Sequence, residues 1–452
     1  MKNFAFLKIF LIFMEKIARL ETFYEEKILT ENNTNVELLK PCKISLNKIK
    51  AEILSNRQIL LDCYENKLLS KDKVDKALLS LGKCVSGFLK LHSLLIHLSS
   101  NSVIPETFIF LEETLKKQEK LSDINLKIVL LTQDFLTRNA HKDFSSLPFL
   151  SEHEKMPTAM YLPILENTNP LYWVLLVKNV FLNLDKLKVD SKTIISNLIE
   201  DKFNEEQQKI VKKLVGGLIS DLFTIRLFGP AYFYLMIEMG ILRSIAESDK
   251  RYLPTLAIRE ELIYNELIKL NLADKVENTH RWFNDLAGLS NQLHANLGFQ
   301  IDLPDLKVFL SNLVDKLNEE VNKILDESVV FKTNDFQKSL VAYERLKDDI
   351  LISSSYMFEL NEIKTSYEKA CNQTNGALNI YDYLNKLKEI PNTPQQIVNA
   401  GWIYKENTID KAFLEFLSGN VEFDFIGSYV KKLDDILIKS IETSRIHCVL
   451  LS

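Results

Sequence analysis

The sequence predicts a mainly α-helical, multi-helical protein with at most a small β-sheet, and three observations indicate this fold class. Glycine and proline are scarce, with 12 and 11 positions among 452 residues, so few sites interrupt a helix. Leucine, lysine and glutamate, which favour helices, are abundant. Apolar residues recur at three- and four-residue spacing, with charged residues between them, along most of the chain. A chain of this length is expected to form two or three domains.

We expect residues 1–135 to form a long helical, coiled-coil-like N-terminal arm. Its first segment, residues 4–14, is an apolar run that resembles the start of a signal peptide, but Lys8 interrupts it and no small-residue cleavage site follows. The run is also shorter than the roughly 20 apolar residues that span a bilayer. It therefore predicts an amphipathic helix and no stable membrane insertion, with attachment to a membrane surface as the alternative.

The rest of this N-terminal region continues the helical pattern. Residues 47–69 and 73–100 carry apolar residues at helical spacing, and the segment 105–122 opens with Pro105, which suits the first turn of a helix. Such helices pack as antiparallel neighbours or form a coiled coil. A homo-oligomer assembled through the N-terminal helices is therefore one expectation.

Residues 136–330 are predicted to form a second domain, and residues 331–452 a helical C-terminal region. Within the second domain, residues 136–168 are rich in loops and prolines, and residues 159–165 form a candidate strand. The very apolar stretch 214–242 contains three charged residues and an internal proline. We expect it to be a buried helix pair and not a membrane span.

Charge and cysteine content limit the partners and the compartment. The formal net charge is −5 and no long basic run occurs, so a nucleic-acid partner is not expected. The five cysteines are odd in number and include no C-x-x-C pair. This usage is typical of a cytoplasmic protein with reduced, buried thiols.

The most informative motif is "NPLYWVLLVKNVFLNLD", residues 169–185. It resembles the active-site helix of the HExxH zinc metallopeptidases, the zincins, in which two histidines four residues apart share one helix face and hold the metal. The glutamate beside the first histidine is the general base in that family. Here Lys178 and Leu182 stand at the two histidine positions, and Asn179 stands at the glutamate position.

Three further stretches resemble the same family in the same order. "GGLISDLFTIRLFGPAY" (216–232) is similar to the downstream segment of the glutamate-type zincins, with Gly217 at the position of the third metal ligand. Asp221 is kept, and its counterpart in the family supports a ligand histidine. "PTLAIR" (254–259), "PNTPQQIVNAGWIY" and "LIKSIETS" look like later parts of these proteins, so the resemblance covers roughly residues 140–450.

The departures from the family decide what the resemblance implies about chemistry. Leucine cannot bind zinc, lysine must first lose a proton against a pKa of about 10.4, and asparagine cannot act as a base. The ligands and the base are therefore lost at Lys178, Asn179, Leu182 and Gly217. We expect no catalytic residue, no metal and no cofactor at this site, and no zinc-dependent hydrolysis.

The retained residues suggest a different role for the site. If the fold of the family is kept, Asp221 points at Lys178, whose ammonium replaces the lost positive charge, and we hypothesise a buried ion pair between them. The alternative is that Lys178 extends to solvent. Arg226 and Arg259 are expected to be structural clamps on carbonyls or carboxylates, and Tyr232 to lie in the core with its hydroxyl paired. A remaining substrate groove that uses the arginines is the other interpretation.

The histidines offer no complete metal-binding motif. His153 is followed by a glutamate, but a proline occupies the place of the second histidine. His280 and His294 are too far apart in sequence to share a helix face. Should a metal be bound nevertheless, the residues to test first are His141, His153, His280 and His294.

We expect a catalytically inactive, metallopeptidase-like protein that acts as a protein-binding or regulatory component. Its protein partner would be held by the former cleft or by the N-terminal helices. Two alternatives stay open. One is a hydrolase whose catalytic residues have moved elsewhere, which cleft carboxylates with perturbed pKa values would favour. The other is a structural helical protein whose first 135 residues set an oligomer.

Overall fold

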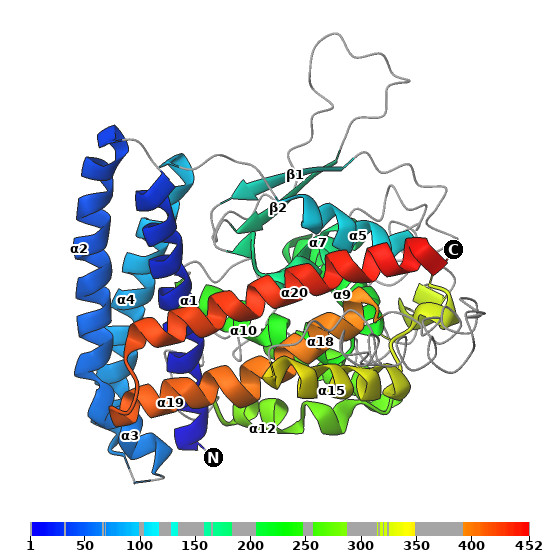
Figure 1. Ribbon diagram of the computed structural model, residues 1–452. Coiled ribbons are helices and arrows are strands. Elements are labelled where there is room, and N and C mark those ends of the chain that lie inside the picture. Colours follow the sequence, from blue (N-terminus) through cyan, green and yellow to red (C-terminus); the bar gives the residue numbers. More distant parts are fainter. Residues whose placement is uncertain are drawn as a thin grey trace, which may run out of the picture.

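The structure is a computed structural model, and helices form most of it (Figure 1). The residues that the structure describes are 2–30, 33–65, 67, 69–98, 104–116, 128–133, 158–163, 166–182, 205–246, 256–286, 314, 317–319, 321–322, 325–348 and 392–451. The mainly α-helical fold class predicted from the sequence is therefore confirmed.

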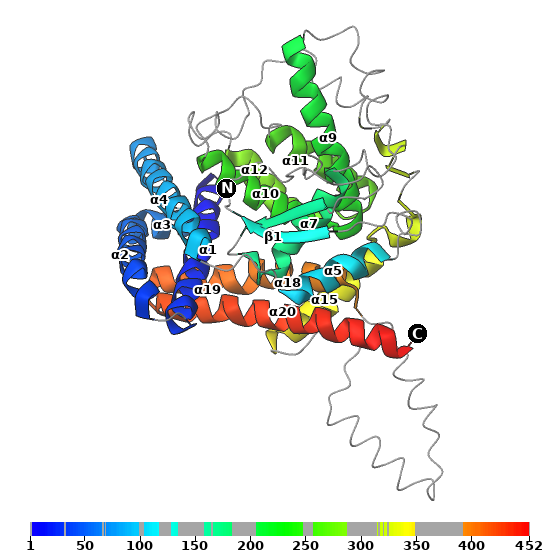
Figure 2. The same ribbon diagram turned by 90° about the horizontal axis from the view of Figure 1, so that it is seen from above.

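The described residues up to 116 form consecutive helices, as predicted, but residues 128–133, which were predicted to be helical as well, form a strand. The bounds of these helices are α1 (Lys2–Thr30), α2 (Asn33–Ser55), α3 (Arg57–Tyr64), α4 (Lys71–Leu98) and α5 (Pro105–Lys116). The proline expected in a first helical turn begins α5. Helices α2 and α4 pack side by side (Figures 1 and 2). Both also contact α1, and α4 contacts α10 as well.

A small parallel sheet of two strands follows. β1 (Ile128–Gln133) pairs with β2 (Thr158–Pro163), with Ile128 opposite Thr158 at one end and Gln133 opposite Pro163 at the other. β2 confirms the strand predicted within residues 159–165. The sheet lies beside α7, which β2 contacts (Figure 2).

Helices make up the described remainder of the chain. The next elements are α7 (Pro170–Leu182), α9 (Glu205–Phe228), α10 (Pro230–Ala246), α11 (Leu256–Lys269), the 3-10 turn η4 (Ala273–Lys275) and α12 (Glu277–Leu286). The last are the 3-10 turn η5 (Glu327–Val329), α15 (Thr333–Lys347), α18 (Pro394–Tyr404), the π-helical turn η6 (Lys405–Ile409), α19 (Asp410–Ser418) and α20 (Phe423–Leu451). Helices α9 and α10 are the buried pair predicted for residues 214–242.

Between Ala5 and Leu20, helix α1 is buried on all of its faces, which corrects the amphipathic helix predicted at the N-terminus. Every side chain from Ala5 to Leu20 is buried, including the charged Lys8, Glu15, Lys16 and Arg19. The helix packs against α2, α3, α10, α12 and α20, so protein surrounds it where the prediction placed solvent. It is therefore part of the folded body and not of a separate arm.

Among the described residues, no helix combines the length and apolarity needed to cross a bilayer.

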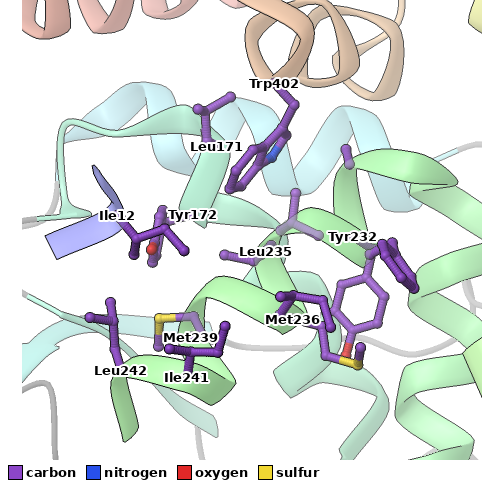
Figure 3. Close-up of a cluster of buried hydrophobic side chains, with 14 of the residues drawn as sticks. Ile12, Leu171, Tyr172, Tyr232, Leu235, Met236, Met239, Ile241, Leu242 and Trp402 are labelled. Carbon is purple, nitrogen blue, oxygen red and sulfur yellow. The ribbon is translucent and has the colours of Figure 1, made fainter. Parts of the chain in front are cut away.

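One continuous apolar core joins α1 to the rest of the fold. Figure 3 shows part of it, with Ile12 of α1 near Tyr172 of α7, and Trp402 of α18 near Leu171. Because α1 and α20 also pack together, contacts cross both of the predicted domain boundaries, at residues 135 and 330. The division into three regions stays a prediction.

The turn between α9 and α10 offers a test of how closely this core is packed. Gly229 has a φ of +53°, and a Cβ built on it would lie 2.6 Å from Cδ1 of the buried Phe331. We expect Gly229→Ala to lower the free energy of unfolding by about 2–4 kcal/mol, because it adds left-handed backbone strain to a steric clash. Urea unfolding followed by circular dichroism measures the change.

Gly216, inside α9, is the matched control for this substitution. A Cβ built there would meet no heavy atom within 4 Å. Because alanine favours a helix interior over glycine, Gly216→Ala should raise the free energy of unfolding by about 0.5–1 kcal/mol. Equal changes in the two variants would contradict the close packing inferred at Gly229.

Candidate functional site

Four of the five binding or structural candidates from the sequence meet at one place. Lys178 lies on α7, Asp221 on α9, Tyr232 on α10 and Arg259 on α11. These helices are neighbours, because α9 packs against α7, α10 and α11. We call these four residues the Asp221 site.

The carboxylate of Asp221 contacts the other three side chains directly. Lys178 Nζ lies 2.8 Å from Asp221 Oδ1, which confirms the ion pair hypothesised from the sequence. Arg259 approaches with two nitrogens, Nε at 2.6 Å from Oδ2 and Nη2 at 2.8 Å from Oδ1. The hydroxyl of Tyr232 donates a hydrogen bond to Oδ1. Arg259 is thus the carboxylate clamp that was expected.

Burial and charge fix the protonation states at the site. The side chain of Asp221 is 1% exposed, and those of Lys178 and Arg259 are each 15% exposed. Burial by itself would raise the pKa of Asp221, but the charges of Arg259 and Lys178 outweigh it and hold that pKa well below its usual range. Burial and the adjacent carboxylate raise the pKa of Tyr232 well above its usual value, so its hydroxyl remains a donor.

A single turn between two helices brings Tyr232 to the carboxylate. Gly229, in the left-handed conformation, follows the end of α9, and α10 begins at the next residue. Asn399 of α18 holds this turn, because its side chain accepts a hydrogen bond from the backbone of Ala231 and donates one to the carbonyl of Phe228. The turn folds α10 back along α9, so Tyr232 reaches a carboxylate eleven residues earlier in the chain.

The side chains at the positions where the resemblance would place zinc ligands do not fit a zinc ion. The ammonium of Lys178 is engaged by a carboxylate. Asn179 and Leu182 on α7, and Gly217 on α9, offer neither a zinc ligand nor a general base. Within the described part of the chain, no group of three or more His, Cys, Asp or Glu side chains is placed to hold a metal ion.

Arg226 lies apart from the Asp221 site although it is close in sequence. Five residues turn a helix by about 140°, so Arg226 faces a different side of α9 from Asp221. Its Nε lies 2.7 Å from Oε1 of the buried Glu266, and its Nη2 lies 2.9 Å from Oδ1 of Asn318. Arg226 thus holds α9 against α11 and is a structural clamp, as expected.

His280 is the candidate histidine that falls within the described residues. Its Nδ1 lies 2.6 Å from Oε1 of the buried Glu260, and its ring stacks on Tyr264 with centroids 3.6 Å apart. Burial raises the pKa of Glu260, and the hydrogen bond from His280 opposes this rise. The candidates outside the described residues are His141, His153 and His294.

The cysteines that the structure describes in full are buried, free thiols, as expected. They are Cys42, Cys63 and Cys84. Burial raises the pKa of Cys63 to about 12 and that of Cys84 to about 11. Thiols with such pKa values carry almost no thiolate near neutral pH, so they are unreactive. Cys371 lies outside the described residues.

A second cluster of buried charged residues was not predicted from the sequence. We call it the α1 network, and its members are Glu15, Lys16, Arg19, Glu166, Glu238, Lys405 and Asp434. Lys405 Nζ lies 2.5 Å from Oε2 of Glu15 and also contacts Glu238. Lys16 Nζ lies 2.8 Å from Oε1 of Glu166 and 3.0 Å from Oε1 of Glu238.

Arg19 extends the α1 network to the last helix of the chain. Its Nε lies 2.8 Å from Oε1 of Glu15, and its guanidinium contacts both carboxylate oxygens of Asp434 on α20. The sequence feature that could have predicted this network is the set of charged residues inside the apolar N-terminal run. That feature shows only that buried partners are needed and does not identify them.

The comparisons assign no family to this geometry. Comparison of the chain with protein-family models, with curated proteins and with solved structures found no match. The function is therefore argued from the Asp221 site itself and from the resemblance of the sequence stretches that build it.

Arg259 is the main partner of the buried carboxylate, and its removal tests this assignment. We expect Arg259→Met to lower the free energy of unfolding by about 3–5 kcal/mol, because it removes two hydrogen bonds to a buried charge. Lys178→Met should lower it by about 1–3 kcal/mol, because Arg259 and Tyr232 still hold Asp221. Urea unfolding near neutral pH measures both variants.

An exposed ion pair on α12 supplies the control for these two variants. Arg281 pairs with Glu277, and their side chains are 53% and 45% exposed. Solvent screens such a pair, so Arg281→Met should change stability by less than about 1 kcal/mol. A larger loss in Lys178→Met than in Arg259→Met would contradict the order of partners at Asp221.

Proposed function

We propose that this chain is a catalytically inactive protein of zincin-like descent that binds or regulates another protein. The ion pair between Lys178 and Asp221, at 2.8 Å, carries the proposal. In the family that the sequence resembles, the counterpart of Asp221 supports a ligand histidine, and Lys178 occupies that histidine's position. A fixed ammonium thus stands where the resemblance places a ligand and its metal.

The chemistry of the Asp221 site supports binding over hydrolysis. General acid–base catalysis works best with groups whose pKa lies near the operating pH. The pKa of Asp221 is held low and that of Tyr232 is raised, so neither group exchanges a proton near neutral pH. The amide of Asn179 has no basic site. The described site is therefore suited to a fixed structural or recognition role.

The same proposal includes a cytoplasmic location and a protein partner. Three buried, free thiols in the described part of the chain support a reducing compartment. The partner would contact either the helices around the Asp221 site, where the side chains of Lys178 and Arg259 are each 15% exposed, or the helices α2 and α4.

A hydrolase with relocated catalytic residues is the alternative, and the pair of Glu260 and His280 favours it. The pKa of Glu260 is raised by burial, and the ring of His280 is 23% exposed. Hydrolysis of a broad panel of peptides and esters, abolished in Glu260→Gln, would support this alternative.

A structural oligomer built through the N-terminal helices is the other alternative. It would appear in light scattering as a multiple of the mass of one chain.

Metal content is the first measurement on the wild-type chain. We expect near-zero zinc per chain by mass spectrometry, both as purified without chelators and after zinc is offered, because Lys178 and Leu182 supply no ligand. About one zinc per chain would overturn the proposal. Substitution of His141, His153, His280 and His294 would then locate the metal.

Restoration of the family's ligands tests the zincin descent directly. The variant combines Lys178→His, Asn179→Glu, Leu182→His and Gly217→Glu, which returns the two histidines, the base and the third ligand to α7 and α9. Positions four apart on α7 share a face, and α9 packs against α7. If these helices keep the geometry of the family, the variant should bind one zinc per chain.

The matched control carries Leu182→Ala in place of Leu182→His and so lacks one ligand. It should bind zinc much more weakly, because a structural or catalytic zinc site needs at least three protein ligands. Circular dichroism verifies that both variants are folded. A folded, fully restored variant that binds no more zinc than the control would refute the descent from zincins.

A further inference from the structure

The α1 network contains more carboxyl groups than cations. Among the described residues, four carboxyl groups face three cations, namely Glu15, Glu166, Glu238 and Asp434 against Lys16, Arg19 and Lys405. Each of these residues is at most 5% exposed. Burial of an uncompensated charge is costly, so this interior disfavours the excess negative charge.

Lys8 forms another cluster of this kind, about two to three helical turns earlier on α1 than the α1 network. Its Nζ lies 2.7 Å from Oε2 of Glu406 and also contacts the carboxylate of Asp410, the first residue of α19. Both Lys8 and Asp410 are buried. Lys8 thus pairs with two carboxyl groups, so the carboxyl groups that contact this cation are in excess by one.

We propose that the contact of α1 with the C-terminal helices α19 and α20 is proton-dependent, with a proton held on Asp434 and on Asp410 when the contact is tight. Each of these carboxyl groups shares its α1 cation with a second carboxyl group. Arg19 also contacts Glu15, and Lys8 also contacts Glu406. This proton-dependent contact is independent of the proposed function, because it involves none of the residues of the Asp221 site.

The groups around Asp434 favour its protonated form. The charged groups that face it are Arg19 and Glu15 of α1 and Glu166, which precedes α7. Burial raises the pKa of Asp434 to about 7, and the charge of Arg19 opposes this rise. At Glu15 the balance is reversed, because Lys405, Lys16 and Arg19 together outweigh burial and lower its pKa. The excess proton therefore belongs on Asp434.

The groups around Asp410 also favour its protonated form. The charged groups that face it are Lys8 of α1 and Glu406 and Lys405 of η6. Burial raises the pKa of Asp410 to about 6, the charge of Lys8 opposes this rise, and the charge of Glu406 adds to it. Both carboxyl groups with raised pKa thus lie on the C-terminal side of the contact with α1.

The sign of the pH dependence follows from proton binding. Both pKa values in the folded protein exceed the value of about 3.9 for an unfolded aspartate, so folding takes up protons between about pH 4 and pH 7. Stability contributed by these groups is therefore complete below about pH 4 and is lost as the pH rises through their folded pKa values. Between about pH 6 and pH 8, linkage gives about a tenfold loss from Asp434 and about a twofold loss from Asp410.

Hydrogen–deuterium exchange of the full-length chain, corrected for the intrinsic pH dependence of exchange, measures this loss by segment. We expect the opening constants of amides in α1 and α20 to rise about 20-fold between about pH 6 and pH 8. In the variant that combines Asp410→Asn and Asp434→Asn, which mimics the protonated groups, the opening constants should be independent of pH over this range. Glu260→Gln, which changes another buried carboxyl group with a raised pKa, is the matched control and should keep the wild-type dependence.

Infrared spectroscopy of the wild-type chain supplies a readout that needs no variant to fold. A protonated carboxyl group absorbs apart from carboxylates, so the proposal requires such a band near pH 6 that disappears near pH 8. Selective loss of this band in the Asp434→Asn variant would support the placement of the proton on Asp434. Absence of the band in the wild type, or an unchanged exchange profile between the two pH values, would overturn the proposal.

Discussion

The burial of α1 on every face between Ala5 and Leu20 is the constraint on which the rest of the structure depends. A helix that carries charged side chains into a core needs a partner for each of them, because an unpaired charge cannot leave water without a large cost. The partners of Lys16 and Arg19 come from before α7, from α10 and from α20. The first helix is therefore tied to the last one, and the whole described chain shares one core.

In the two buried charge clusters, the pKa of an aspartate shifts in opposite directions. At the Asp221 site, two cations face one carboxylate, so the pKa of Asp221 falls and the site keeps a fixed positive charge. In the α1 network, the carboxyl groups outnumber the cations, and the pKa of Asp434 rises toward neutrality. Both carboxyl groups are almost completely buried. The local ratio of charges, and not burial alone, thus decides which group ionises.

The Asp221 site also illustrates how a metal position can change its role under the proposed zincin descent. Loss of a metal and its ligands would leave Asp221 buried without compensation, and an unpaired carboxylate inside a protein is strongly destabilising. An ammonium from Lys178 and a guanidinium from Arg259 remove that cost. Under that proposal, the helices around the site would keep their positions without the chemistry of a hydrolase, and their surfaces would serve recognition.

The sequence by itself determined the mainly helical class, the strand near residue 160 and the α9–α10 pair, because periodicity and proline placement are local properties. The contact of Lys178 with Asp221 was predicted from the resemblance to the zincins and not from such local patterns. The sequence did not predict that α1 is central or that Asp434 is the partner of Arg19. Those features depend on which elements meet across more than 400 residues of chain, as the separation of 415 positions between Arg19 and Asp434 shows. Only the tertiary structure decides such pairings, because any buried cation can be satisfied by any carboxylate that packing brings within reach.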